Sequence, residues 1–468
     1  MNENEISEFR SDVRAWLQDN KPAAPAFLLP ETFMEVGTDQ QFEFLRRWQQ
    51  TVYEAGYLGM SWPEAYGGGG QPQVMQEIVN QEMAAQRVPF VPNTIGLNWA
   101  GPLILDMGSE ADKQRYIKNI LSAEDIWCQG FSEPDHGSDL GNAQVRAVKD
   151  GDEYVINGSK IWTSLGSYAK YMILIARTAN EGPNKYAGLS FFLAPMTADG
   201  IAPTPIKKLT GEYGFCQTYF TDARIPADCM LGNEGEGWSV AMKTLMFERG
   251  AVGGQAGGLS MMDLNINDIV ELARRATRNG RPAIEDPLTR DELVKLVLEA
   301  KGNAAMGSRA RIPALGGTYP TAVAMSGKLR NSELKRKMTR FAVSLQGANG
   351  ARYISEDALD GGKWQRSYLN SFSFILFISI YFSYSKFSSF SFICSIINLS
   401  YSSFSSLTFN FWIRFSFYSS ICSSFVFMIS MRFFSCSSCS SCALSFWIRL
   451  CFSSSSCSYL TIILSLIC

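Results

Sequence analysis

The pattern of apolar and polar positions changes twice along the first 370 residues of this 468-residue chain. Near the start, apolar residues recur at i, i+4, i+7 and i+8: Phe9, Val13, Trp16 and Leu17. This spacing predicts an amphipathic helix with one face toward a core. Helical spacing continues over residues 42–55 and 74–85. The first part of the chain is therefore predicted to be helical.

The second part has the pattern of a sheet. Residues 127–228 hold short β-rich runs, such as 171–176 and 189–193, separated by Gly, Pro and Asp. Helical periodicity returns after Gly237, with one stripe at Leu293, Leu296 and Val297 and a second helix over 329–345. Helices, then strands, then helices predict an α+β fold with segregated layers. We expect domains over 1–125, 126–236 and 237–370.

Residues 371–468 differ in composition from the rest of the chain. They contain no Gly, Pro, Asp or Glu, and their only charged residues are Lys386, Arg414, Arg432 and Arg449. A domain needs turn formers and a charged surface, so we expect no ordinary fold for this low-complexity tail and expect proteases to cut between Arg366 and Lys386. Serines interrupt each apolar run before the ~18 residues of a membrane-spanning helix, which disfavours a membrane anchor.

Three cysteines of the tail, Cys436, Cys439 and Cys442, have the spacing of an iron–sulfur or zinc site. No Cys-Pro closes the motif and no His follows it, so we predict no metal site. The abundance of Phe, Ser, Leu and Ile matches the antisense of an A-rich coding region. Our hypothesis is that a gene joint or a wrong reading frame produced this segment, and sequencing the transcript across codons 365–375 tests it.

Charge and cysteine content limit the possible functional classes of the part of the chain before residue 371. The 42 Lys and Arg residues less the four of the tail leave 38 against 44 acidic residues, without a basic patch, so we expect no nucleic-acid partner. The start is polar and acidic rather than a signal peptide, which predicts a cytoplasmic protein. Only Cys128, Cys216 and Cys229 precede the tail, as expected for isolated buried thiols in a reducing compartment.

Two polar motifs in the β-rich region carry the candidate chemistry. The first spans residues 127–140 and contains Phe131, Ser132, Glu133, Gly137 and Ser138. Its hydroxyls, backbone groups and glycines supply hydrogen bonds and allow close approach of a large ligand. The second spans residues 157–164 and ends in an indole beside two hydroxyls: Trp162, Thr163 and Ser164.

Together these motifs resemble the flavin-binding signatures of the acyl-CoA dehydrogenase family. Segments 56–70, 223–226 and 231–238 add to a resemblance that runs from about residue 5 to about residue 370. It implies an FAD-dependent oxidoreductase of fatty acid and lipid metabolism, with a helical domain, a middle β-barrel and a helical bundle. The implied flavin contacts are Phe131, Ser132, Gly137, Ser138, Trp162, Thr163 and Ser164, with Gln346 and Gly347 in a later Gly-rich segment.

The implied reaction is α,β-dehydrogenation of an acyl-CoA thioester, which needs a protein base and a hydride acceptor. The segment 244–250 resembles the family branch in which Glu248 is the base, and Arg249 and Ser138 correspond to substrate contacts. Leu245, Glu248 and Val252 share one helix face, so we expect a partly desolvated carboxylate. The alternative is a surface Glu paired with a cation. His136, the only histidine, has no relay partner and is predicted to be a loop contact.

The family pattern is incomplete in two places. Residues 274–280 lack the aromatic residue of a family turn, so we assign no arginine there. The family's C-terminal flavin loop and last helix, where other branches carry the base, have no counterpart in 371–468. The alternatives are therefore an inactive or partner subunit, or a flavin oxidase or monooxygenase of the same fold. The resemblance also implies an electron-transfer flavoprotein as acceptor and a homo- or hetero-oligomer.

Overall fold

The computed structural model describes residues 2–180, 182–248, 265–310, 312, 320–353, 355 and 358–382, and four strands within 410–467. The chain divides into two units, Met1–Tyr384 and Ser385–Cys468, which we describe separately.

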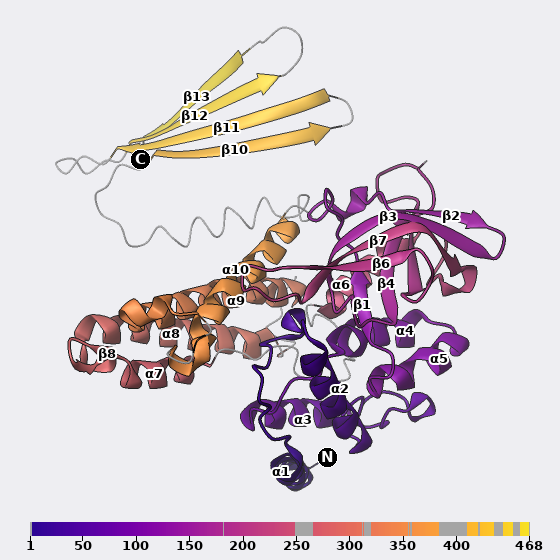
Figure 1. Ribbon diagram of the computed structural model, residues 1–468. Helices are drawn as coiled ribbons and strands as arrows, with labels where there is room; N and C mark the ends of the chain where they lie inside the picture. The colour runs from indigo at the N-terminus through magenta and orange to yellow at the C-terminus, as the bar shows by residue number, and fades with distance from the viewer. Residues whose placement is uncertain are drawn as a thin grey trace. The chain divides into compact units, whose positions relative to one another are not determined.

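The first unit begins with the predicted helices (Figure 1). They are α1 Glu3–Asn20, α2 Asp39–Glu54, α3 Gln73–Ala85, α4 Gly101–Met107 and α5 Glu110–Leu121. Asn2 caps α1, since its side chain accepts from the Glu5 N–H while the Glu5 carboxylate accepts from the Asn2 N–H. Val13 and Leu17 are buried on α1, which confirms the predicted apolar stripe.

The β-rich region forms one seven-stranded sheet. Its strands are β1 Trp127–Gly130, β2 Arg146–Asp150, β3 Glu153–Ser164, β4 Tyr171–Arg177, β5 Leu189–Pro195, β6 Ile201–Ile206 and β7 Phe215–Pro226. The order is β1-β4-β2-β3-β7-β6, and β5 pairs with β4. β1 runs parallel to β4, whereas β3 and β7 are antiparallel.

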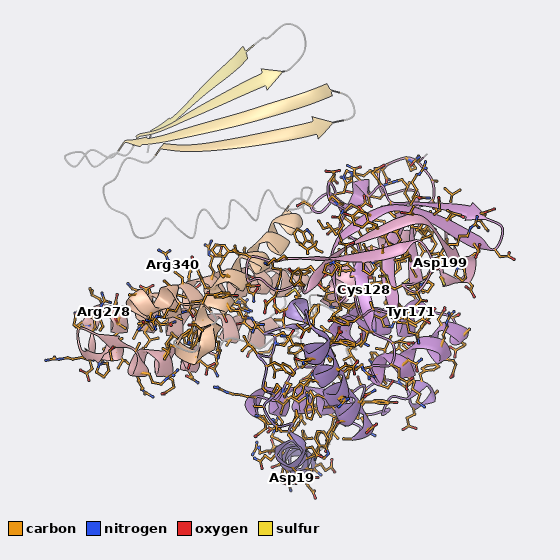
Figure 2. All side chains as sticks on the ribbon, viewed as in Figure 1. Asp19, Cys128, Tyr171, Asp199, Arg278 and Arg340 are labelled. Atoms are coloured by element: carbon orange, nitrogen blue, oxygen red, sulfur yellow. The ribbon has the colours of Figure 1, made fainter. Side chains whose placement is uncertain are left out.

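Strand β4 separates two hydrophobic cores, because alternate side chains of a strand point to opposite faces. Ile173 and Ile175 pack in a core shared with the N-terminal helices, while Met172 and Leu174 pack inside the β-domain. β1 divides in the same way. Trp127 stacks on Tyr171 at 5.1 Å between ring centroids, and Cys128 lies in the inner core. Cys128 and Tyr171 are labelled in Figure 2. The first polar motif thus begins on a strand whose two faces are both packed in hydrophobic cores.

A second set of helices follows the sheet. They are α6 Gly237–Glu248, α7 Ile266–Arg275, α8 Pro287–Ala310, α9 Pro320–Leu345 and α10 Lys363–Phe382, with the short hairpin β8 Thr277–Arg278 and β9 Arg281–Pro282 after α7. Leu272, Leu296, Met338 and Trp364 lie in a separate core of the bundle α7–α10. Leu293 and Leu296 are buried as the α8 stripe predicted.

One expectation about the chain's end needs correction. Helix α10 extends from Lys363 to Phe382. Arg366 lies inside this helix and is 2% exposed, so it is no site for limited proteolysis, and Lys386 lies outside the described residues. A protease needs an accessible, locally unfolded backbone, which a packed helix does not offer.

The second unit contains four antiparallel strands: β10 Asn410–Ser419, β11 Cys422–Phe434, β12 Ala443–Phe452 and β13 Tyr459–Ile467. Composition did not lead us to expect this sheet. Its strands are rich in Phe, Ile and Trp, residue types that favour extended backbone. Within the described part of the chain, no helix has the length and apolar character needed to cross a membrane.

Candidate functional site

The indole of Trp162 is displayed by a bulge in β3. The register between β3 and β7 shifts between Lys160 and Thr163, and Trp162 has φ +62° within that shift. A left-handed conformation is uncommon for a bulky residue and points to a functional constraint. The indole is 47% exposed and meets the Phe215 ring edge-on at 5.9 Å. The strand therefore presents a large flat apolar side chain to the outside, because bulges re-aim side chains.

The two hydroxyl residues after the indole point inward. Thr163 is fully buried and accepts a hydrogen bond from Thr218 Oγ1 on β7 at 3.2 Å. Ser164 is also buried. The Thr163 hydroxyl thus secures the end of β3 beside the bulge.

The structure brings the two polar motifs into contact. The backbone N–H of Ile161 on β3 donates to the Ser132 carbonyl at 2.8 Å. Phe131 is buried and packs edge-on against Phe191 at 5.9 Å. The loop that follows β1 therefore starts directly beside the strand that carries Trp162.

A buried ion pair holds this loop in place. Lys160 Nζ lies 2.8 Å from Glu133 Oε1 and donates to the Phe131 carbonyl at 3.0 Å. The Glu133 carboxylate also accepts hydrogen bonds from the backbone N–H groups of Gln144 and Val145, at 2.7 and 2.9 Å. Burial alone would raise the pKa of Glu133, but the Lys160 charge and these hydrogen bonds hold it below its usual value. One ion pair thus holds both ends of the loop.

Arg177 holds the second half of the same loop. Its guanidinium donates to the carbonyls of Gly141 and Ala143 at 3.0 and 2.9 Å, and to those of Lys185 and Ala187 at 3.1 and 3.0 Å. Burial lowers the pKa of this arginine. The guanidinium donates hydrogen bonds to backbone carbonyl groups rather than to a carboxylate. These bonds fix the backbone around the loop tip.

The loop tip is open. A Cβ atom built at Gly137 would meet nothing within 4 Å, and Ser138 is exposed. Among the described residues, the backbone N–H groups of Gly137 and Ser138 have no hydrogen-bond acceptor. The tip can therefore donate to an anionic or carbonyl group of a ligand. His136 exchanges backbone hydrogen bonds with Glu133 and shapes the turn, as expected for a loop contact.

Glu248 is the last residue of α6. The helix begins in close contact with β5, because a Cβ atom at Gly237 would lie 2.4 Å from the Ser190 carbonyl carbon. Thr244 and Phe247 are buried, and Glu248 next to them is half-buried. Arg249 and Val252, which belong to the same prediction, lie outside the described residues.

The last two predicted cofactor residues lie at the end of α9. Gln346 is buried and its Oε1 accepts from Gln365 Nε2 of α10 at 3.2 Å. Gly347 has φ +55° and open space around its Cβ position. In the described part of the chain, no hydrogen bond joins either residue to the Trp162 strand or to the loop. The structure thus brings together the loop and β3, and leaves this pair in the helical bundle.

No metal site was found among the described residues, where no three His, Cys, Asp or Glu side chains cluster. Sequence reasoning missed Lys160 and Arg177, the two cations that hold the loop. The burial of Lys160 was predictable from the sequence. The alternation of side chains that buries Tyr154 and Ile156 also turns residue 160 inward. Arg177 ends the fully buried strand β4, and nothing in its local sequence distinguishes it.

Comparison with known proteins gives three family matches in chain order. The descriptions are acyl-CoA dehydrogenase N-terminal domain for residues 3–124, middle domain for residues 128–223 and C-terminal domain for residues 235–374. A similar relative is acyl-CoA dehydrogenase IpdE1 of Mycobacterium tuberculosis, 35% identical over 372 residues, which cover 78% of this chain and 91% of the relative.

Solved structures agree with this match. The Tcur3481-Tcur3483 steroid ACAD has a TM-score of 0.66 and 28% identity, and the alignment covers 80% of this chain and 93% of that chain. The ChsE4-ChsE5 complex from Mycobacterium tuberculosis has a TM-score of 0.63 and 26% identity over the same shares. The family match ends at residue 374, inside helix α10.

Proposed function

Because this chain belongs to the acyl-CoA dehydrogenase family, we propose that it oxidises an acyl-CoA thioester across its α and β carbons with FAD as cofactor. The observation that carries the proposal is the exposed indole of Trp162, displayed by a bulge beside a loop whose tip has open backbone donors. An indole face suits the flat isoalloxazine ring, and the donors suit its carbonyl and phosphate oxygens. The residues present therefore fit a flavin.

The predicted cofactor residues of the loop and of β3 have a place in this proposal, whereas Gln346 and Gly347 of the helical bundle are proposed as cofactor contacts from the family resemblance alone. Phe131 and Ser132 begin the loop, and Ser138 stands at its open tip. Thr163 secures the strand after the indole, and Ser164 is buried next to it. FAD, when bound, supplies the hydride acceptor. Lys160 and Arg177 order the loop before any ligand binds. They therefore reduce the free energy that ligand binding must spend on ordering the loop.

Glu248 is the proposed base. Its carboxylate stands at the end of α6 beside the buried residue Phe247, where a half-buried group is accessible to substrate yet partly withdrawn from water. In the reaction it would take the α-proton of the thioester. Arg249 and Ser138 are proposed substrate contacts. Such a base needs no metal ion.

Substrate class and assembly are proposed from the relatives. Among similar structures, one is named a steroid ACAD and another is a complex of two different chains. We therefore propose a bulky, polycyclic or branched acyl-CoA as substrate and a hetero-oligomeric assembly. An electron-transfer flavoprotein is the proposed electron acceptor, and the proposed location is the cytoplasm.

A second candidate is a partner subunit that binds without turnover. It is favoured by the end of the family match at residue 374, beyond which the composition changes. In such a subunit the loop and the indole would persist while the dehydrogenation site stays incomplete.

The test is a visible spectrum of the purified protein, followed by anaerobic addition of acyl-CoA. Enzyme function predicts bound FAD whose visible absorption bleaches, with bulky acyl-CoAs acting more rapidly than butyryl-CoA. Bound FAD that no acyl-CoA bleaches would support the partner-subunit alternative. A colourless protein that does not take up added FAD would contradict the proposed cofactor.

A further inference from the structure

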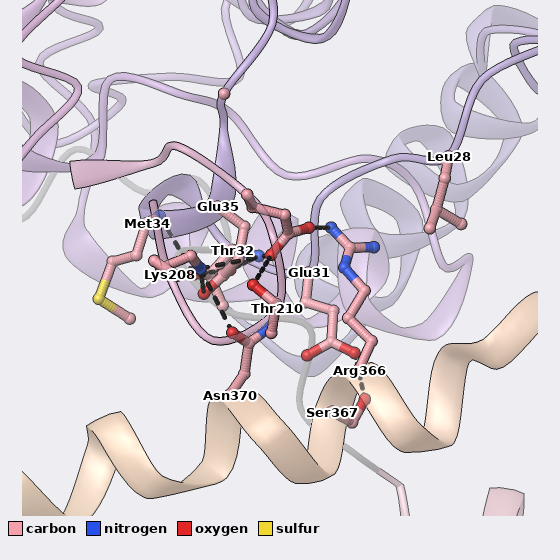
Figure 3. A network of polar contacts seen from close by, with 12 residues as sticks. Leu28, Glu31, Thr32, Met34, Glu35, Lys208, Thr210, Arg366, Ser367 and Asn370 are labelled. Atoms are coloured by element: carbon pink, nitrogen blue, oxygen red, sulfur yellow. Dashed lines mark hydrogen bonds and ion pairs between the residues drawn. The ribbon is translucent and has the colours of Figure 1, made fainter. Parts of the chain in front are cut away.

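Three segments that lie far apart in the sequence meet in one polar network (Figure 3). They are residues 28–35 of the N-terminal domain, the loop 207–214 between β6 and β7, and helix α10. The first two segments approach closely, because a Cβ atom at Gly214 would lie 1.8 Å from the Met34 carbonyl oxygen. The network therefore joins all three domains of the family-like part of the chain.

Lys208 is the residue that touches each segment. Its Nζ lies 3.4 Å from Glu35 Oε1 and 3.4 Å from Glu212 Oε2, and it donates to Asn370 Oδ1 of α10 at 3.3 Å. The side chain is 11% exposed. The contacts with Glu35 and Asn370 are hydrogen bonds, and the contact with Glu212 is an ion pair.

The same ammonium group also lies over an aromatic ring that contacts Trp162. Lys208 Nζ lies 5.7 Å from the centre of the Phe215 ring, within cation–π range. The Phe215 ring in turn supports the Trp162 indole edge-on at 5.9 Å. A continuous chain of contacts thus leads from Asn370 on α10, through Lys208 and Phe215, to Trp162.

Helix α10 has other attachments that do not involve Lys208. Arg366 donates to the Leu29 carbonyl at 2.8 Å and pairs with Glu212, and Ser367 donates to Glu31. Replacing Lys208 should therefore leave the helix docked. The contribution of Lys208 to Trp162 can then be separated from the docking itself.

We propose that Lys208 is a positioning residue that couples the docking of α10 to the orientation of Trp162. The proposal rests on the proposed function, in which Trp162 holds the flavin. The coupling makes cofactor retention depend on Asn370, a residue of another domain that lies in the last family-like helix. A neutral side chain at 208 would release both the Phe215 ring and the acceptor on α10.

The experiment compares Lys208→Met, Lys208→Arg and Asn370→Ala in the full chain. The first readout is hydrogen–deuterium exchange of the apoprotein over residues 160–166, and the second is the dissociation constant for added FAD. We expect Lys208→Met to speed exchange there and to weaken FAD binding on the order of tenfold, the scale of typical long-range coupling. Asn370→Ala should have a smaller effect in the same direction. Lys208→Arg should keep most of the wild-type protection from exchange and most of the wild-type FAD affinity.

Two controls separate positioning from general stability. Lys207→Met changes an exposed neighbouring charge and should alter neither readout. Glu82→Gln removes the partner of Arg10 and Arg14 in the N-terminal domain, so it should lower stability without faster exchange over 160–166. Exchange and FAD binding that are both unchanged in Lys208→Met would overturn the proposal. If that variant does not fold, Asn370→Ala carries the same test.

The result also separates this inference from the proposed function. A wild-type protein that binds no FAD contradicts the proposed function, whereas the exchange measurement on apoprotein still tests the coupling. Normal FAD binding in the wild type together with unchanged exchange in Asn370→Ala and Lys208→Met contradicts only the coupling.

Discussion

Lys160 and Glu133 form an ion pair that is almost completely withdrawn from water, with 2.8 Å between Nζ and Oε1 and side-chain exposures of 0% and 6%. Breaking such a pair is costly, because the remaining charge stays buried without compensation. The pair also joins the two ends of the loop. Lys160 donates to the carbonyl of Phe131, where the loop begins, and Glu133 accepts from the N–H of Val145, where the loop ends. Order in the loop and stability of the β-domain are therefore linked.

Lys160→Met is expected to lower the free energy of unfolding by about 3–5 kcal/mol, the range for a broken buried pair. Urea unfolding of the apoprotein measures this. The double variant Lys160→Met/Glu133→Gln should be less destabilised than Lys160→Met alone, because no buried charge is left. A double variant that is as unstable as the sum of both single variants would argue against a coupled pair.

Trp162→Ala is expected to weaken FAD binding more than it lowers the melting temperature of the apoprotein. The indole is 47% exposed, so little core packing is lost. Trp127→Ala is the matched control, since Trp127 is fully buried and its loss should cost about 3–5 kcal/mol. Equal loss of apoprotein stability in both variants, with FAD affinity intact in Trp162→Ala, would make Trp162 an ordinary packing residue.

Glu248→Gln is expected to keep FAD bound while slowing bleaching by acyl-CoA about 10²–10⁴-fold, as for loss of a general base. Stopped-flow absorbance under anaerobic conditions measures this rate. Glu271→Gln, on the exposed face of α7, is the control and should bleach normally. Near-normal bleaching in Glu248→Gln would move the base elsewhere.

Glu35→Gln is expected to change how stability depends on pH. Burial raises the pKa of Glu35, and the nearby Lys208 only partly offsets this. A carboxyl whose folded pKa is raised stabilises the protein fully below its unfolded pKa, and this contribution is lost as pH rises through the folded pKa. The variant should therefore gain stability relative to wild type as the pH rises from 5 to 8. Urea unfolding at both pH values provides the test, and a constant difference would be evidence against a raised pKa.

Replacing residues 375–468 with the corresponding segment of a family member is expected to raise solubility and FAD content together. The family resemblance implies a flavin-contacting loop and a last helix after this point, and a bundle that lacked them would leave apolar surface uncovered. Soluble yield and the ratio of FAD to protein are the measurements. A full chain that already purifies soluble, yellow and protease-resistant through Cys468 would contradict this interpretation of the tail.

The helices and strands were largely predictable because their patterns are local. The stripe at Val13 and Leu17 and the apolar run of β4 depend on periodicity alone, and the structure confirms both. The bulge at Trp162 was not predictable, since it arises from the pairing of β3 with β7. The contact of Lys208 with Asn370 spans 162 residues, and no local signal encodes a pairing at that separation.

Helix α10 runs uninterrupted through residue 374, where the family match ends. A junction placed inside a helix has a rotational phase as well as a position, because each residue turns the following chain by about 100°. One extra residue in an engineered terminus would therefore swing everything after it by more than a quarter turn, whereas four would bring it back to within about 40°. A graft at this point should accordingly be tested as a series of one-residue steps, and function should return with the period of the helix.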